Sequence, residues 1–322
     1  MRTARRLVGT LLVVVLGVAV GQAPAAAADY PNPGLVTGDV AVHDPAMVRA
    51  ANGTYFLFST GTGIDIRTST DRVAFRRIGS AFPNGAPWAH PFTGGSDTLW
   101  APDLSFHNGQ YYLYYAASTF GSRNSAIFLA TSTTAQPGSW TNRGIAVQTS
   151  NSSDHNAIDP NLVVDAAGAW WLTYGSFWTG IKMVRLDPAT GKPSGGTRYS
   201  LAQRPSSVEG AIEAPYLVPR NGYYYLFVAF DFCCRGTSST YRVMVGRSTS
   251  ITGPYMDRNG VAMTSGGGTE ILATHGNIHG PGHPAVMQDS DGWLLVYHYY
   301  TSSGSRLGVN LIDWGDGWPR LF

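Results

Sequence analysis

Charged residues are scarce in this chain of 322 residues. Asp, Glu, Lys and Arg make up 13% of it, about half the usual share in a globular protein. The formal net charge is +2, which is too small for the basic surface of a nucleic-acid-binding protein, so we exclude a nucleic-acid partner. Glutamate is the rarest acid, because the sequence contains only Glu209, Glu213 and Glu270. A glutamate at a motif position is therefore informative.

Cysteine is also rare, and its two copies, Cys233 and Cys234, are neighbours. Adjacent cysteines cannot connect distant segments, which excludes the disulfide framework of a small secreted domain. A zinc site is disfavoured, since there is no second cysteine pair and no histidine at finger spacing. Two alternatives stay open, a vicinal disulfide ring or two free thiols. In either case we expect the pair to shape the loop of residues 230–237 locally.

Long apolar runs are missing after the first 20 residues. The run at residues 7–20 follows Arg2, Arg5 and Arg6 and precedes small residues up to Ala28. It is too short for a confident membrane span, and the pattern is typical of a cleaved export signal. We expect residues 1–28 to be removed, which leaves 29–322 as one domain with a net charge of −1. The predicted product is secreted and extracellular, has no membrane segment and is a monomer.

Aromatic residues and glycine are abundant, and they recur in a fivefold repeat. The chain has 17 Tyr, 9 Trp, 13 Phe and 39 Gly. Each repeat opens on a proline, and the prolines lie between 55 and 69 residues apart. The five openings are His43-Asp44-Pro45, Trp100-Ala101-Pro102, Ile158-Asp159-Pro160, Glu213-Ala214-Pro215 and Gly282-His283-Pro284.

Each opening is followed by a turn and then by an aromatic strand. The turns are Asn52-Gly53, Asn108-Gly109, Ala167-Gly168, Asn221-Gly222 and Asp291-Gly292. Asn-Gly and Asp-Gly are the strongest short hairpin signals, because both residues tolerate a positive φ. Units of this length, built from several short strands, bury their faces only by packing around an axis. The sequence therefore predicts an all-β fold, a five-bladed β-propeller.

Three of the five openings carry an acid: Asp44, Asp159 and Glu213. Equivalent positions in a propeller lie on one rim of the axis, so we expect these acids to converge at the mouth of the central channel. Each Asp-Pro pair alone could be a simple turn or cap. A fourth acid, Asp103, follows its proline, and alternation along the strand should point it elsewhere, in a structural role.

Three converging acids in an exported, aromatic-rich, weakly charged chain favour the hydrolysis of glycosidic bonds. That reaction uses one protonated carboxylic acid and one carboxylate that activates water or attacks the sugar. The apolar neighbours of Glu213 should raise its pKa and suit it to the role of general acid. Asp44 is then the base, and a negative Asp159 would hold the geometry and raise the pKa of Glu213 further.

The motifs resemble those of glycoside hydrolase family 43, and within it the arabinanases. The resemblance rests on His43-Asp44-Pro45, Ala157-Ile158-Asp159-Pro160-Asn161 and Ile212-Glu213-Ala214-Pro215-Tyr216, and on longer strings between them from about residue 39 to Pro319. It implies a five-bladed propeller that cleaves α-1,5-linked L-arabinofuranose chains with inversion. By motif, Asp44 would be the general base, Glu213 the general acid and Asp159 the group that tunes and orients the acid. For inversion, the base and acid carboxyls should lie roughly 6.5–9.5 Å apart.

The resemblance also implies an ion, usually calcium, in the central channel, where the matching ligand is His283. A lone imidazole is a weak ligand for calcium, which prefers oxygen, so waters would do most of the coordination. Alternatively, His283 is a hydrogen-bonded channel residue. No organic cofactor is expected.

Other residues near the openings are candidates for contact with sugar. The stacking candidates are Trp100, Phe120, Phe177 and Trp178, and the hydrogen-bonding candidates are Asn156 and Ser176. Each of the aromatic residues could equally be part of the core between blades.

The expected partner is plant arabinan or its oligosaccharides, and the preferred action is endo. Three alternatives are an exo-acting arabinofuranosidase or xylosidase on the same scaffold, a retaining propeller that acts on sucrose or fructans, and a sugar-binding propeller without catalysis. The sequence ends soon after Trp318-Pro319 with no added β-sandwich, which favours the arabinanase. The Ile212–Tyr216 string argues against the retaining enzymes, and the presence of all three acids argues against a purely binding role.

Overall fold

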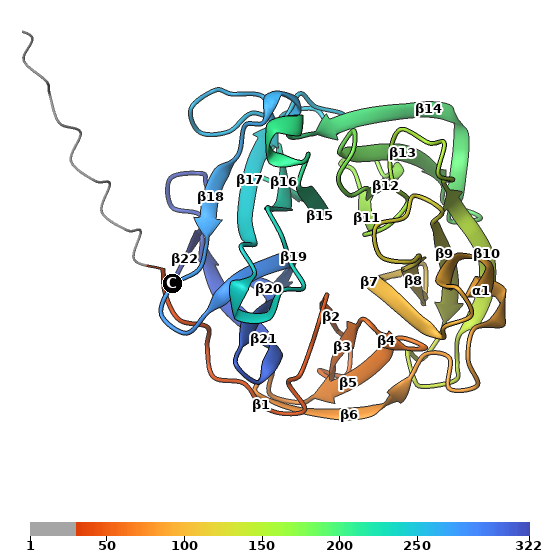
Figure 1. Ribbon diagram of the computed structural model, residues 1–322. Coiled ribbons are helices and arrows are strands. Elements are labelled where there is room, and N and C mark those ends of the chain that lie inside the picture. The colour runs from red at the N-terminus through yellow and green to blue at the C-terminus, as the bar shows by residue number, and fades with distance from the viewer. Residues whose placement is uncertain (1–29) are drawn as a thin grey trace, which may run out of the picture.

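Five sheets stand around a central axis and form a five-bladed β-propeller, as the repeat predicted (Figure 1). All strand pairs within them are antiparallel except β1 (Thr37–Gly38) with β6 (Ala74–Ser80). The computed structural model describes residues 30–322, so the expected export signal at residues 1–28 lies outside the described part. No helix within residues 30–322 is both long and apolar enough to cross a membrane.

The first two blades have five strands each. Blade 1 has the order β1-β6-β5-β3-β2 and consists of β1 (Thr37–Gly38), β2 (Ala46–Arg49), β3 (Tyr55–Ser59), β5 (Asp65–Ser69) and β6 (Ala74–Ser80). Blade 2 has the order β10-β9-β8-β7-β4 and consists of β4 (Gly61–Thr62), β7 (Thr98–His107), β8 (Gln110–Ala117), β9 (Ala126–Ser132) and β10 (Thr141–Gln148). Strand β4 lies between two strands of blade 1 in the sequence, but in space it belongs to blade 2, where it pairs with β7.

The other three blades have four strands each, in sequence order from the axis outward. Blade 3 consists of β11 (Asn161–Val164), β12 (Trp170–Tyr174), β13 (Ile181–Asp187) and β14 (Lys192–Ala202). Blade 4 consists of β15 (Ile212–Arg220), β16 (Tyr223–Phe230), β17 (Arg242–Ser248) and β18 (Thr269–Leu272). Blade 5 consists of β19 (His279–Asp289), β20 (Gly292–Thr301), β21 (Gly304–Asp313) and β22 (Arg320–Leu321). The short helices are η1 (Pro87–Ala89), α1 (His90–Thr93), η2 (Ser206–Val208), η3 (Gly236–Ser238) and η4 (Met263–Ser265).

The predicted turns connect the two strands of one hairpin in each blade. These hairpins are β2–β3, β7–β8, β11–β12, β15–β16 and β19–β20. Asn108 and Gly109 both have positive φ, as do Asn221 and Gly222, which is the requirement of a type I′ turn. At Asn52-Gly53, Ala167-Gly168 and Asp291-Gly292 only the glycine has a positive φ. The aromatic strands that follow are almost wholly buried.

The core consists of five apolar layers, each between two neighbouring blades. Phe58 and Leu113 lie in the layer between blades 1 and 2, and Tyr114 and Leu172 in the layer between blades 2 and 3. The remaining layers join blades 3 and 4, blades 4 and 5, and blades 5 and 1. Most of the abundant aromatic residues are used here, because each blade buries both of its faces against neighbours.

The segment before the first blade closes the ring. The Gly34 amide donates to the Val309 carbonyl, and the Leu307 amide donates to the Val40 carbonyl. Strand β1 then pairs in parallel with β6 of blade 1. This segment therefore contacts both blade 5 and blade 1.

Candidate active site

The residue before each repeat proline has a left-handed backbone. The φ angles are 51° at Asp44, 45° at Ala101, 55° at Asp159, 54° at Ala214 and 53° at His283. Residues with a side chain rarely adopt this conformation, which costs roughly 1–2 kcal/mol. Its presence in all five blades shows that the repeat builds the same bend at the start of every inner strand. Three of these residues, Asp44, Asp159 and His283, line a cavity on the propeller axis.

Glu213 occupies a different repeat position from the two aspartates, which corrects the expectation that the three acids are in register. It precedes Ala214, the residue equivalent to Asp44 and Asp159. Its own equivalent in blade 2 is Trp100. The bend brings both positions to the same cavity, so the convergence of the acids is confirmed although their register is not.

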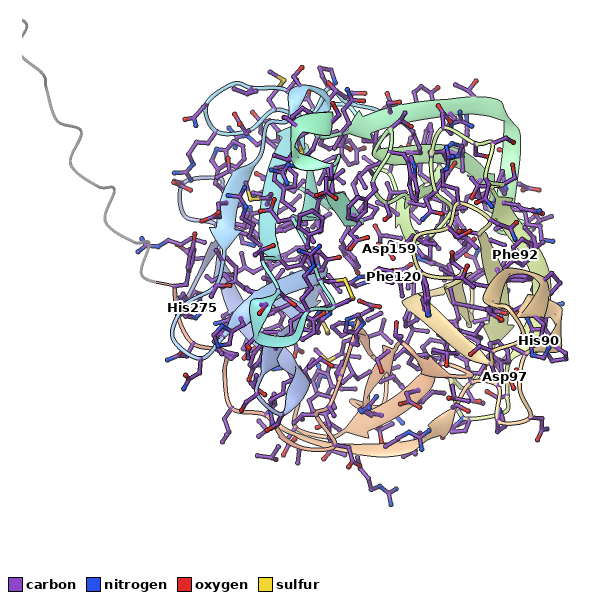
Figure 2. The ribbon with its side chains drawn as sticks, in the orientation of Figure 1. His90, Phe92, Asp97, Phe120, Asp159 and His275 are labelled. Carbon is purple, nitrogen blue, oxygen red and sulfur yellow. A yellow bond between two sulfur atoms is a disulfide. The ribbon has the colours of Figure 1, made fainter. Side chains whose placement is uncertain are left out.

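The cavity has a volume of about 890 Å³ and receives residues from all five blades. Figure 2 shows Asp159 and Phe120 beside the central opening, whereas His90, Phe92 and Asp97 lie at the outer edge. All ten residues proposed from the sequence line this cavity: Asp44, Trp100, Phe120, Asn156, Asp159, Ser176, Phe177, Trp178, Glu213 and His283. A cavity of this size is at the upper end for small-molecule sites.

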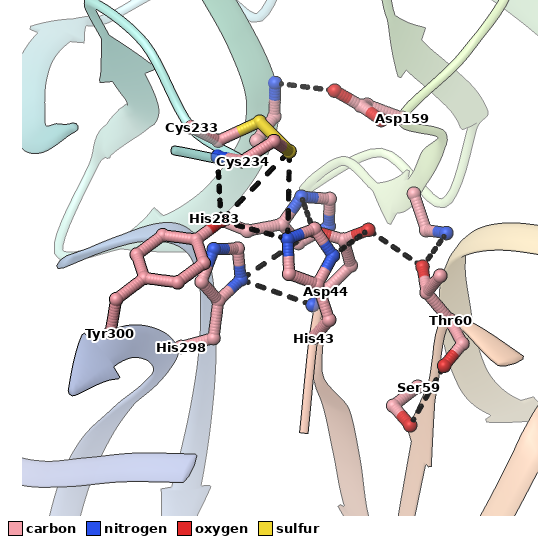
Figure 3. A network of polar contacts seen from close by, with 12 residues as sticks. His43, Asp44, Ser59, Thr60, Asp159, Cys233, Cys234, His283, His298 and Tyr300 are labelled. Atoms are coloured by element: carbon pink, nitrogen blue, oxygen red, sulfur yellow. Dashed lines mark hydrogen bonds and ion pairs between the residues drawn. A yellow bond between two sulfur atoms is a disulfide. The ribbon is translucent and has the colours of Figure 1, made fainter. Parts of the chain in front are cut away.

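Asp44 is held by residues of blades 1 and 5 (Figure 3). Its Oδ2 accepts a hydrogen bond of 2.6 Å from the Thr60 hydroxyl and lies 3.0 Å from His43 Nδ1. Its Oδ1 lies 3.2 Å from His283 Nδ1. Its backbone amide donates to His298 Nδ1.

The electrostatic environment keeps Asp44 ionised. Burial by itself would raise the pKa of Asp44, but the neighbouring histidines, His43 above all through its charge and its hydrogen bond, lower it well below the usual range. Burial lowers the pKa of His283, while burial and the neighbouring His43 lower that of His298 well below its usual value, so both rings are neutral near pH 7. Burial opposes the charged form of His43 as well, but Asp44 attracts a proton to that ring and raises its pKa.

The other two acids resist ionisation. Burial and the charge of Asp44 raise the pKa of Glu213 to about 7, although the Ser176 hydrogen bond works against the shift. Burial and the charges of Glu213 and Asp44 raise the pKa of Asp159 well above its usual range. These two acids therefore retain a proton near neutral pH, at the same time as Asp44 carries a negative charge.

The hydrogen-bond partners favour Glu213 over Asp159 as the holder of that proton. Asp159 Oδ2 accepts the Ala214 amide at 3.0 Å, and an amide can only donate, so this contact favours the charged form of Asp159. Glu213 Oε2 lies 2.7 Å from the Ser176 hydroxyl. A hydroxyl can either donate or accept, so Glu213 keeps its partner when it is protonated. The hydroxyl of Ser176, expected to bind sugar, contacts Glu213 instead.

The aromatic candidates lie toward the rim. Phe120 is 84% exposed and Trp178 is 38% exposed, so neither is a core residue. Arg123 lies over the Trp178 ring at 5.3 Å. Phe177 contacts Phe232, whose ring centre is 6.0 Å away. Exposed rings around a cavity are suited to stacking on the apolar faces of sugars.

Asn156 and Asp103 separate into two different roles. Asn156 is buried, and its Oδ1 accepts the Ser125 hydroxyl. Its amide nitrogen has no hydrogen-bond partner among residues 30–322 and is available to a ligand in the cavity. Asp103 accepts the Asn161 side chain and the Leu162 amide, so it has the structural role that the sequence predicted, and it exerts that role by joining blade 2 to blade 3.

The loop after β16 carries a disulfide between Cys233 and Cys234, which resolves the two alternatives left by the sequence. Both cysteines line the cavity. The Cys234 amide donates to the Tyr300 hydroxyl. The pair thus shapes its loop, as expected, and also forms part of the site.

Sequence reasoning missed Thr60, His298 and Tyr300, and named His43 only as part of the Asp44 motif. Thr60 follows the aromatic strand β3, and His298 and Tyr300 follow the apolar residues of β20. In both places a polar residue interrupts an apolar run. That interruption was the available signal. The equivalent strands of blades 2 and 4 carry Ala116 and Ala229 opposite their own inner strands.

The surroundings of His283 fit a weakly held, water-rich cation but not a cage of protein ligands. Its neutral ring has a lone pair to offer, and the negative Asp44 is 3.2 Å away. Clusters of three metal-binding side chains do occur among residues 30–322, at His43 with the two cysteines and at His43 with Asp44 and His298. His283 belongs to neither cluster, and the disulfide removes the thiolates of the first.

An axial cavity that combines an ionised carboxylate with a carboxyl pair that retains a proton has the two groups that glycosidic hydrolysis requires. The fold and the site therefore define a propeller of the glycoside hydrolase class. The model of the glycosyl hydrolases family 43 matches residues 31–319, and the chain belongs to this family.

Similar proteins agree with this assignment. The chain is 41% identical over 285 residues to the extracellular endo-α-(1→5)-L-arabinanase 1 of Bacillus subtilis, covering 86% of this chain and 87% of that one. A family 43 endo-arabinanase structure from Bacillus licheniformis matches with a TM-score of 0.84 and 43% identity, covering 89% and 99% of the two chains. An exo-1,5-α-L-arabinanase structure from a bovine ruminal metagenomic library matches with a TM-score of 0.83 and 40% identity, covering 89% and 99%.

Proposed function

We propose that this protein is an arabinan endo-1,5-α-L-arabinosidase, which cleaves internal α-1,5 linkages of L-arabinofuranose chains by inversion. The observation that carries the proposal is the convergence of Asp44, Asp159 and Glu213 in one axial cavity, in a chain related over most of its length to endo-arabinanases. An extracellular relative supports secretion toward polymeric arabinan.

In this mechanism the proton of Glu213 goes to the oxygen of the leaving sugar. Asp44 takes a proton from a water molecule on the opposite face of the ring, and that water attacks the anomeric carbon. The pKa of about 7 keeps Glu213 protonated at slightly acidic pH, whereas Asp44 stays ionised. Asp159 holds the Ala214 amide at the start of the inner strand and thereby orients Glu213.

Sugar units on either side of the cleaved bond would contact the rim. The exposed rings of Phe120 and Trp178 provide stacking surfaces, and Trp100 and Phe177 line the wall between them and the acids. The free amide of Asn156 would donate to a sugar hydroxyl.

Exo action is a second candidate, because one solved relative with 40% identity is named an exo-1,5-α-L-arabinanase. The size of the cavity favours endo action, since about 890 Å³ is more than one terminal sugar needs. The two modes differ in their first products, so the size of early products separates them.

Calcium at His283 is part of the proposal, with waters as the other ligands. Such an ion would supply positive charge beside Asp44. We expect dialysis against a chelator to lower kcat, and added calcium to restore it. Calorimetric titration of calcium into the chelator-treated protein should give a binding heat that His283→Ala abolishes. A binding heat unchanged in His283→Ala would contradict the assignment of this ligand.

The role of Glu213 is tested by Glu213→Gln, which keeps the shape and the Ser176 contact but has no acidic proton. We expect kcat on linear arabino-oligosaccharides to fall by about 10² to 10⁴, the usual contribution of a general acid, with KM nearly unchanged. Proton NMR of the wild-type reaction should show the inverted anomer first. Retention of configuration would refute Asp44 as a base, and a fall of less than tenfold would refute Glu213 as the acid.

A further inference from the structure

A line of polar contacts connects the disulfide loop to Asp44 (Figure 3). The Cys234 amide lies 2.9 Å from the Tyr300 hydroxyl. That hydroxyl lies 2.9 Å from His43 Nε2, and His43 Nδ1 lies 3.0 Å from Asp44 Oδ2. The His43 ring is held on its flat side by His298, stacked at 4.1 Å.

The two ends of this line together set the directions of the hydrogen bonds between them, because the Cys234 amide only donates and the ionised Asp44 carboxylate only accepts. The Tyr300 oxygen accepts from the Cys234 amide. The Tyr300 proton can then go to Cys234 Sγ at 3.9 Å or to His43 Nε2 at 2.9 Å, and the nitrogen is the closer and stronger acceptor. In a neutral imidazole one nitrogen accepts and the other carries the proton. His43 therefore carries its proton on Nδ1 and donates it to Asp44 Oδ2.

A second series of hydrogen bonds, which begins at a backbone amide of blade 2, also ends on Asp44 Oδ2. The Ala101 amide donates to the Thr60 hydroxyl at 2.9 Å, and Thr60 donates to Asp44 Oδ2 at 2.6 Å. Both lines begin at a backbone amide and both end on Oδ2. The other oxygen, Oδ1, faces His283 and is the one left with a lone pair for the proton of a water molecule.

The first line depends on a local turn that the disulfide closes. Cys234 has a φ of 66° and an exposed side chain, so burial does not hold this left-handed residue in place. Its restraints are the covalent bond to Cys233 and hydrogen bonds at the ends of the loop, among them the contact of its own amide with Tyr300. Cys234 Sγ also lies 3.8 Å from His43 Nε2, beside the Tyr300 contact.

We propose that the Cys233–Cys234 disulfide, Tyr300 and His43 are positioning residues for the base, which fix His43 as the Nδ1–H tautomer and direct Asp44 Oδ1 toward water. Their catalytic importance rests on the proposed function, whereas the tautomer of His43 does not. The disulfide thus contributes to the reaction by orienting a backbone amide rather than by its redox chemistry.

The tautomer is measured directly by ¹⁵N NMR of histidine-labelled protein at pH 8.5, with the His43 signals assigned by their loss in His43→Asn. The wild type should show a protonated Nδ1 and an unprotonated Nε2 at His43. Tyr300→Phe, which removes only the hydroxyl, should give a mixture of both tautomers. A wild-type His43 that is protonated on Nε2, or on both nitrogens at this pH, would overturn the proposal.

Kinetics then test the link to the base. Tyr300→Phe should lower kcat about tenfold, the equivalent of one hydrogen bond, with KM changed less than twofold. The matched control is Tyr225→Phe, which removes another phenol hydroxyl, one bonded to the Gly317 carbonyl outside the cavity; its kcat and the His43 signals should match the wild type. Equal losses in the two variants would overturn a positioning role for Tyr300.

The disulfide is tested by the double variant Cys233→Ser, Cys234→Ser. It should show the tautomer mixture and the loss of kcat seen in Tyr300→Phe. Both are measured below the unfolding temperature of the variant, where it is still folded. Wild-type NMR signals in this variant would overturn the role of the disulfide. A wild type that does not cleave arabinan would refute the proposed function alone, because the NMR result would stand by itself.

Discussion

At the scale of single residues, the three acids differ because of their neighbours rather than their type. Asp44 is surrounded by imidazoles and is ionised. Glu213 is buried beside the charge of Asp44, Asp159 is buried beside the charges of Glu213 and Asp44, and both have raised pKa values. Sequence reasoning anticipated a raised pKa at Glu213 from its apolar neighbours. It placed His283 in the channel but could not anticipate that His283 and His298 contact Asp44, because both come from the other end of the chain.

The pKa of Glu213 predicts the alkaline side of the pH profile. The acid must be protonated to act, so kcat/KM should fall as pH rises through about 7. The Ser176 hydroxyl stabilises the charged form, and Ser176→Ala should therefore raise the pKa of Glu213 and move this limb to higher pH. Initial rates across the pH range measure the shift.

Ser118→Ala is the matched control, because Ser118 also lines the cavity but bonds Ser125 instead of Glu213. Its alkaline limb should coincide with that of the wild type. If Ser176→Ala moves the limb to lower pH, the direction of the hydrogen-bond effect on Glu213 is wrong.

At the scale of elements, the inner strands are joined to one another by side chains below the cavity. Asp103 of β7 accepts from Asn161 and Leu162 of β11, and Asn161 in turn accepts the Leu217 amide of β15. Three blades are connected in this way. The structural role expected for Asp103 followed from strand alternation, but its partners did not, since they depend on how far the blades are rotated against each other.

Asp103→Ala should destabilise the fold. It leaves the buried Leu162 amide and the Asn161 side chain without an acceptor, at a cost of about 2–4 kcal/mol in the free energy of unfolding. Urea unfolding at constant pH measures this loss. The control Asp313→Ala removes an exposed carboxylate that bonds Gly315 and should cost less than about 1 kcal/mol. Equal losses would show that the connection between blades 2 and 3 contributes nothing specific.

The strands themselves were predictable, because a proline, a glycine turn and an aromatic run recur five times, and four of the five turns are Asn-Gly or Asp-Gly. The exceptions were local. No sequence pattern predicts that β4 pairs with blade 2, because Gly61–Thr62 is only two residues long. No sequence pattern predicts the left-handed backbone before the prolines either, since a residue before proline ordinarily favours an extended backbone.

At the scale of the whole molecule, closure of the ring assembles the site. Asp44 belongs to blade 1, while His283 and His298 belong to blade 5, and the two blades meet only where the chain's ends are joined. The segment that bonds Val309 and pairs with β6 therefore also keeps the base beside its histidines. The repeat predicted the number of blades, but the contacts across this closure come from residues more than 200 positions apart.

The central claim, endo cleavage driven by the axial acids, is tested most directly by the sizes of the first products from debranched linear arabinan. The full-length mature protein should release a range of arabino-oligosaccharides from the earliest time points, and Glu213→Ala should release almost none while still binding the polymer. Arabinose or one fixed short product from the outset would contradict endo action. A Glu213→Ala variant as active as the wild type would contradict the account of the site.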